Sequence, residues 1–135
     1  MHRKEIEIRW RDMDALGHVT NSVFQTYFEE VRDELFERTL HDPDVARNFV
    51  LVHIAISFRK TLTQADDVVT ATCEFVQMGN SSVTTRETIV DREGNVCAEA
   101  ESVTVAWEPL SNRSRPLTPA QRAAFQAALG CPDPN

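Results

Sequence analysis

The sequence has no apolar run that approaches the roughly 18 residues needed to cross a bilayer. It also lacks the apolar segment of a signal peptide, because its first residues, MHRKEIEIRW, soon alternate apolar with charged side chains. These two absences predict a cytoplasmic protein that does not bind membranes.

Cysteine is scarce and its spacing does not favour metal binding. Cys73, Cys97 and Cys131 are odd in number, far apart and free of any C-x-x-C pair. A disulfide framework or a zinc site needs paired or closely spaced cysteines. We therefore predict reduced thiols, no metal and no cofactor.

The chain also lacks an excess of positive charge. It carries 14 Lys and Arg against 21 Asp and Glu, a net charge of -7. A nucleic-acid-binding surface relies on clustered Lys and Arg to neutralise phosphates. We predict no nucleic-acid partner, and a phosphate-bearing ligand would need a local basic patch.

What is present is an ordinary globular composition, with 41% hydrophobic and 26% charged residues in a chain of 135. A chain of this length can bury a core without metals or disulfides. We predict a single domain over residues 1–130 and a frayed tail over residues 131–135.

Hydrophobic spacing divides the chain into one long helix and several strands. Residues 5–10 alternate, which places Ile6, Ile8 and Trp10 on one face of a strand. Apolar side chains at helical spacing over residues 21–39 predict a main helix that packs along its length against a sheet.

Four strands are expected after this helix. Residues 49–58 are apolar on both faces, which predicts a central strand. Turn-forming residues at Gly79-Asn80 and at 91–94 favour hairpins between three further strands. Those strands are expected at residues 67–78, 82–90 and 96–107.

The C-terminal segment TPAQRAAFQAALG predicts a short helix. Thr118 and Gln121 form a capping box, and Gly130 ends the helix. The order of elements predicts the α+β class, with one long helix against an antiparallel meander.

Polar side chains gather between the first strand and the long helix, where Asp12, Asp14 and His18 precede Asn21. The unpaired amides and the dipole of a helix N-terminus favour a developing negative charge. A carboxylate that faces such an amide supplies a base or nucleophile and an oxyanion stabiliser in one place. The alternative interpretation is that Asp14 only caps or shapes the turn.

Residues 9–30 read RWRDMDALGHVTNSVFQTYFEE and contain D-x-D-x-x-G-H-V-x-N before an aromatic helix with F-E-E-x-R. Further matching stretches are ISFRKTL at 56–62, MGNSSV at 78–83 and AEAESVTVAW at 98–107. This pattern resembles the hotdog thioesterases of the 4-hydroxybenzoyl-CoA thioesterase type. The resemblance implies a hotdog fold, in which an antiparallel sheet wraps a long central helix, and an acyl-CoA substrate.

The resemblance also implies roles for individual residues. Asp14 is the expected catalytic carboxylate, acting by direct attack or by activating a water, and the backbone amide of Asn21 is the expected oxyanion donor. Gly17 and His18 are expected beside the substrate, Gly17 because it lets the loop approach a ligand closely. Asp12 is expected to be supporting structure.

Coenzyme A carries phosphates, so basic and polar groups are expected to bind it. We predict substrate contacts from Arg59, Lys60, Ser81 and Ser82, although the two basic residues would alternatively be surface charges at a strand end. The family implies a homodimer or homotetramer. Two rival functions remain open, a non-catalytic acyl-CoA-binding module and a hotdog enoyl-CoA hydratase.

Overall fold

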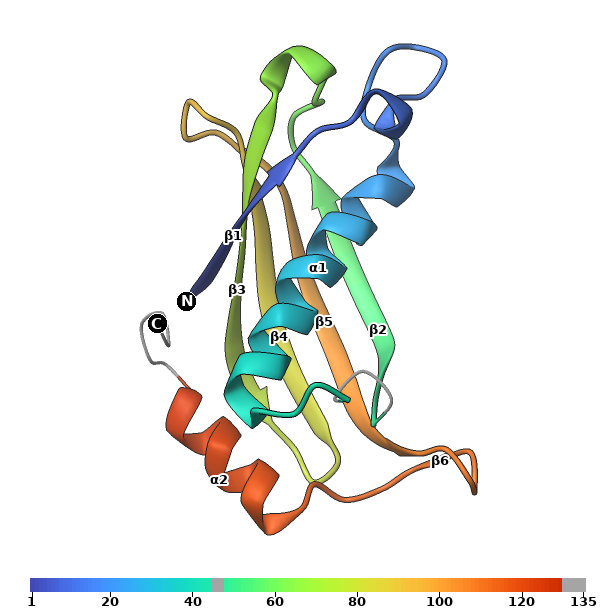
Figure 1. The fold of residues 1–135 in the computed structure, drawn as a ribbon, viewed down its shortest axis with the longest axis vertical. Coiled ribbons are helices and arrows are strands. Elements are labelled where there is room, and N and C mark those ends of the chain that lie inside the picture. Colours follow the sequence, from blue (N-terminus) through green and yellow to red (C-terminus); the bar gives the residue numbers. More distant parts are fainter. Residues whose placement is uncertain (45–47, 130–135) are drawn as a thin grey trace.

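The protein is described by a computed structural model over residues 1–44 and 48–129 (Figure 1). Its helices and strands follow in this order: β1 (His2–Glu7), α1 (Asn21–Leu40), β2 (Phe49–Phe58), β3 (Val68–Met78), β4 (Ser82–Val90), β5 (Val96–Glu108), β6 (Arg113–Ser114) and α2 (Pro119–Ala128). Short 3-10 turns, η1 (Trp10–Asp12) and η3 (Gln64–Asp66), lie in two of the connections.

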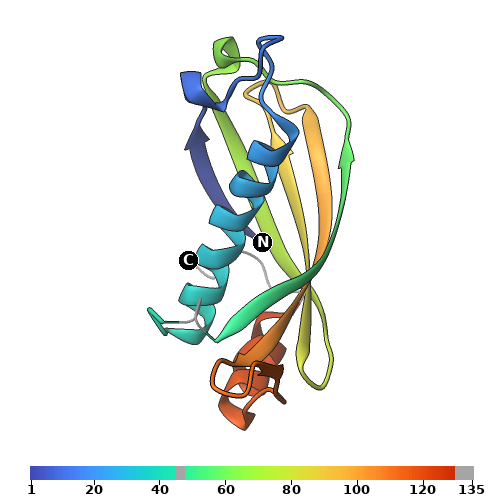
Figure 2. The same ribbon diagram turned by 90° about the vertical axis from the view of Figure 1, so that its right-hand side faces the viewer.

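The strands form one antiparallel sheet in the order β1-β3-β4-β5-β2, with β6 paired to β5. The sheet curls around α1, which lies across one face (Figures 1 and 2). The α+β class, the long helix and both predicted hairpins, β3–β4 and β4–β5, are therefore confirmed.

The position of β2 corrects two predictions. We expected a central strand and a four-stranded meander, but among the described strands β2 pairs only with β5 and forms an edge of the sheet. The connection from β2 to β3 contains η3 and crosses the end of the sheet, so these two strands cannot form a hairpin. Several apolar side chains of β2 are therefore partly exposed in the single chain, and Val52 is 54% exposed.

A bulge in β2 also breaks the predicted alternation. The register against β5 shifts between Leu51 and His53, so Val52 is the extra residue. Leu51 and Ile54 consequently pair with Thr104 and Ser102, whose side chains are buried on the side of the sheet that faces α1.

The first strand ends earlier than its pattern predicts. Ile6 and Ile8 are buried as expected, but Trp10 belongs to η1 and is 78% exposed. The Asp12 carboxylate accepts a hydrogen bond from the Arg9 amide at 2.9 Å, which turns the chain out of the strand. Burial of Trp10 was thus wrongly predicted.

The core joins α1 to the sheet and to α2. Phe36 of α1 contacts Phe49, Phe75 and Phe125, with ring centroids 5.4 to 5.5 Å apart. The Thr118 capping box of α2 is confirmed. Gly130 and the predicted tail lie outside the described residues, so the domain boundary there stays a prediction.

Two of the three cysteines lie in the described part of the chain. Cys73 and Cys97 are free and buried, as predicted, whereas Cys131 lies outside the described part of the chain. Burial raises the pKa of the Cys73 thiol well above its usual range.

None of the helices described is long and apolar enough to span a bilayer.

An ion pair lies inside this core. Arg32 of α1 is 5% exposed, and its Nη1 donates to Oε1 of the fully buried Glu87 at 2.9 Å. Ser102 Oγ also donates to this carboxylate oxygen. The three residues couple α1 to β4 and β5 through groups that cannot be left unpaired in the interior.

Removing one partner of this pair should be costly. We expect Glu87→Gln to lower the free energy of unfolding by about 3 to 5 kcal/mol, because the Arg32 charge would stay buried without its counterion. Urea denaturation measures this loss. The control Glu99→Gln, which removes an exposed partner of Arg59, should cost less than about 1 kcal/mol. Equal losses in both variants would contradict the prediction.

Candidate functional site

The loop between β1 and α1 is held by a buried carboxylate. Asp12 is almost fully buried and accepts hydrogen bonds from the Arg9 guanidinium at 3.0 Å and the Tyr27 hydroxyl at 2.7 Å. Burial by itself would raise the pKa of Asp12, but the hydrogen bonds from Arg9 and Tyr27 outweigh burial and lower this pKa. Asp12 is therefore supporting structure, as expected.

Asp14 lies beyond this anchor in a tight, exposed turn. Its Oδ1 accepts hydrogen bonds from the amides of Leu16 at 2.9 Å and His18 at 3.1 Å. Gly17 closes the turn with φ +80°, a conformation that L side chains rarely adopt. No residue in the described ranges donates to Oδ2 of Asp14, so one carboxylate oxygen is held and the other can reach a ligand.

Helix α1 begins without a side-chain cap, because the hydroxyl of its N-cap residue is bonded elsewhere. Both the amide and the hydroxyl of Thr20 donate to the Asp12 carbonyl, at 3.0 and 3.2 Å. Thr20 therefore gives no side-chain cap, and the Asn21 amide has no acceptor among the residues described. The first turn contains no acidic residue, so the positive end of this 20-residue helix is not neutralised locally.

A pocket of about 270 Å³ gathers these groups. It brings together five predicted site residues, namely Asp14, His18, Asn21, Arg59 and Lys60. Val19, Phe24, Phe58 and Thr61 complete its lining. Phe24 and Phe58 meet edge to face at 5.3 Å and give the pocket an apolar wall.

The two basic residues already have carboxylate partners. Arg59 pairs with Glu99 at 2.7 Å, and both side chains are exposed. Lys60 pairs with Asp91, which raises the lysine pKa, and this bond together with the amide of Asn95 lowers the pKa of Asp91. A phosphate must therefore compete with a carboxylate at either position.

Other predicted residues lie outside this pocket. Gly17 shapes the loop but does not line the cavity. Ser81 and Ser82 lie in the β3–β4 hairpin. Ser82 pairs with Val105, whereas Phe58 pairs with Ala98, so the two positions are seven residues apart on β5, or roughly 23 Å. The substrate roles of Gly17, Ser81 and Ser82 stay predictions.

Sequence reasoning missed the residues that complete the site. The apolar wall of Phe24 and Phe58 joins a helix to an edge strand, and the partners Asp91 and Glu99 come from the β4–β5 turn and from β5. In the sequence, the only sign of this wall was the alternating apolar strand that ends just before Arg59 and Lys60.

Within residues 1–44 and 48–129, no three His, Cys, Asp or Glu side chains are grouped to hold a metal.

Comparison with known proteins identifies the family of this chain. Residues 8–125 match the Thioesterase-like superfamily. No curated protein matches the chain. A thioesterase from Thermus thermophilus, solved with coenzyme A and Zn, is 30% identical with a TM-score of 0.86, over 97% of this chain and 96% of that one.

Two more solved structures are similar. A predicted thioesterase from Bacillus stearothermophilus is 25% identical with a TM-score of 0.86, over 97% of this chain and 98% of that one. A 1,4-dihydroxy-2-naphthoyl-CoA thioesterase from Synechocystis is 19% identical with a TM-score of 0.78, over 93% and 95%, which shows the fold alone. This chain therefore belongs to the thioesterase-like superfamily and has the hotdog fold.

Proposed function

We propose that this protein hydrolyses an acyl-CoA thioester, with Asp14 as the catalytic carboxylate and the Asn21 amide as the oxyanion donor. The observation that carries the proposal is that an Asp14 oxygen without a donor and an uncapped helix amide line the same pocket. The coenzyme A bound by the Thermus thioesterase supports this choice of substrate.

The chemistry requires a nucleophile on one side of the carbonyl and a donor on the other. Either Asp14 removes a proton from water, which then attacks the thioester carbon, or Asp14 attacks and water cleaves the resulting anhydride. In both routes the carbonyl oxygen gains negative charge, which the Asn21 amide and the α1 dipole stabilise. In the first route the C–S bond breaks as the intermediate collapses, and the proton held by Asp14 passes to the departing thiolate. In the second route the C–S bond breaks as the anhydride forms, and water then cleaves the anhydride, which restores Asp14 and supplies the proton for the thiolate. Both routes give a carboxylic acid and the free thiol of coenzyme A.

Arg59 is the better placed of the two cations to bind a phosphate of coenzyme A. Its pair with Glu99 is exposed on both sides, so exchanging the carboxylate for a phosphate costs little. Asp91, the partner of Lys60, is buried and held by the amides of Glu93 and Asn95. To bind a phosphate, Lys60 would have to break its ion pair with this fixed carboxylate. His18 would contact the substrate near Asp14.

We also propose that two copies pair through the edge strand β2. Its Val50 and Val52 are exposed apolar residues on a strand whose outer edge pairs with no described residue. An exposed apolar edge is the usual template for pairing with another chain. Whether such dimers associate further is a separate property.

The first test is Asp14→Asn. Asparagine can accept the same two loop amides, so the turn is retained while the negative charge is lost. We expect kcat on acyl-CoA substrates to fall by about 10²-fold or more, because proton abstraction and nucleophilic attack both need the carboxylate. Release of free thiol measures the rate.

The matched control is Asp44→Asn, an exposed aspartate in the loop after α1. It should keep the parental rate. Full turnover by Asp14→Asn on every active substrate would contradict the mechanism, and tight binding of acyl-CoA without turnover by the parent would favour a non-catalytic binding module.

Tyr27→Phe tests whether the Asp12 anchor positions the loop. Loss of a hydrogen bond to a buried carboxylate should cost about 1.5 to 3 kcal/mol of stability. At a temperature where the variant is fully folded, we expect kcat to fall severalfold because Asp14 and Asn21 lose their fixed relation. An unchanged kcat would mean that Tyr27 stabilises the fold but does not position the loop for catalysis.

The same variant should change the acid sensitivity of the fold. Since the pKa of Asp12 is lowered in the folded protein, its stabilisation is present above about pH 4 and is lost as the pH falls further. Tyr27→Phe reduces that lowering, so the variant should lose less stability than the parent between about pH 4 and pH 2. Denaturation curves across this range measure the slope.

Val52→Lys tests the proposed edge. A lysine at the bulge should prevent strand pairing and convert the protein to a monomer in analytical ultracentrifugation. Leu110→Lys is the control, because Leu110 is 98% exposed in the turn between β5 and β6. A parental mass for Val52→Lys would contradict pairing through β2.

A further inference from the structure

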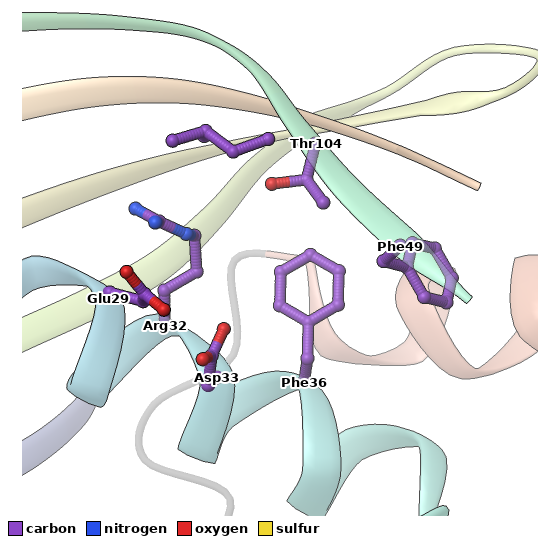
Figure 3. Close-up of a pocket in the computed structure, with 7 residues that line it drawn as sticks. Glu29, Arg32, Asp33, Phe36, Phe49 and Thr104 are labelled. Carbon is purple, nitrogen blue, oxygen red and sulfur yellow. The ribbon is translucent and has the colours of Figure 1, made fainter. Parts of the chain in front are cut away.

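A second cavity, of about 210 Å³, lies between α1 and the β2–β5 side of the sheet (Figure 3). Its apolar lining comes from Phe36, Phe49 and Leu51, and its polar lining from Glu29, Arg32, Asp33 and Thr104. We call this cavity the distal pocket, because it lies further along α1 than Asp14 and Asn21. None of its residues belongs to the site described above.

Arg32 brings donors that the core does not use. Its Nη1 is bound by Glu87 and Ser102, at 2.9 and 3.3 Å. The remaining N–H groups of its guanidinium make no hydrogen bond with any residue that the structure describes. An arginine has five such donors, so this buried side chain can still bind an acceptor in the distal pocket.

Thr104 supplies a second unused group. The residue is 6% exposed, and its Oγ1 is buried without a hydrogen-bond partner in residues 1–44 and 48–129. Figure 3 shows this oxygen turned toward the side of the cavity where the Arg32 guanidinium lies. Buried hydroxyls are normally paired, so an unpaired one that lines a cavity indicates a position for a polar ligand group.

The charges around the pocket select the kind of group. Glu29 and Asp33 place two carboxylates at its lining, and Glu87 already neutralises Arg32. These two carboxylates would repel a further anion, and burial, followed by the charge of Glu29, raises the pKa of Asp33. A hydroxyl fits best, because it accepts from Arg32 or Thr104 and donates to a carboxylate.

An apolar track on β2 lies between the two pockets. Phe58, Ile56, Ile54 and Leu51 lie on the side of β2 that faces α1, since each pairs with a β5 residue buried on that side. Phe58 lines the first pocket and Leu51 the distal pocket. Arg32 follows Asn21 by 11 positions along α1, which corresponds to about 16 Å.

We propose that the distal pocket binds a hydroxyl group near the far end of a long acyl chain, so that the preferred substrates are hydroxylated long-chain acyl-CoA thioesters. This inference rests on the proposed function, because the thioester lies at Asp14 and the chain follows the track on β2.

The experiment compares ω-hydroxyacyl-CoA thioesters with unsubstituted thioesters of the same length, from octanoyl to hexadecanoyl. Dissociation constants are measured by calorimetry on Asp14→Asn protein, which should bind substrates without consuming them. We expect about fivefold tighter binding of the hydroxylated chain at one length, and no difference for chains too short to reach. Equal binding at all lengths would overturn the proposal.

Variants at position 104 assign the preference to the distal pocket. In the same background, Thr104→Val should reduce the preference to about one, whereas Thr104→Ser, which keeps a hydroxyl, should retain it. The control is Thr85→Val on the neighbouring strand β4, a buried threonine that does not line the cavity. A preference that survives Thr104→Val, or that Thr85→Val also removes, would contradict the assignment.

Failure of this inference differs from failure of the proposed function. If the parent hydrolyses both kinds of thioester and binds them equally, the distal pocket has no role in selecting the substrate and the catalytic proposal stands. If the parent releases no thiol from any thioester, the catalytic proposal is wrong, while the binding ratios still decide whether the pocket selects hydroxyl groups.

Discussion

The hydrogen bonds around Asp12 fix the geometry on which the rest of the site depends. Its carboxylate binds Arg9 and Tyr27, and its carbonyl accepts both the amide and the hydroxyl of Thr20. The residue that would normally cap α1 is therefore turned into the loop. The Asn21 amide, which has no acceptor among the described residues, lines the same pocket as Asp14.

The second constraint is the way α1 lies on a sheet that it does not cover completely. Aromatic rings seal one end of the core around Phe36, and the Arg32–Glu87 pair joins α1 to β4 in the middle. The edge strand β2 keeps partly exposed apolar side chains on both of its sides. In our proposals, one side holds the acyl chain and the outer edge pairs with a second copy.

Much of this fold could be predicted because its signals are local. The helix expected over residues 21–39 is observed at Asn21–Leu40, and both hairpins follow from turn residues. The place of β2 could not be predicted, because Phe58 pairs with Ala98 and no short-range pattern specifies that partner. Trp10 was misplaced for a different, local reason, since a hydrogen bond from the Arg9 amide to the Asp12 side chain ended the strand before the alternation did.

The candidate catalytic segment could be located from the sequence, because D-x-D-x-x-G-H-V-x-N resembles the motif of the hotdog thioesterases. The spacing by itself left open that Asp14 only caps or shapes the turn. The groups that meet this segment depend instead on the tertiary structure. Strand order and register bring Arg59 to Glu99 and Arg32 to Thr104, and they are set by burial of the whole core, so no local sequence pattern contains them.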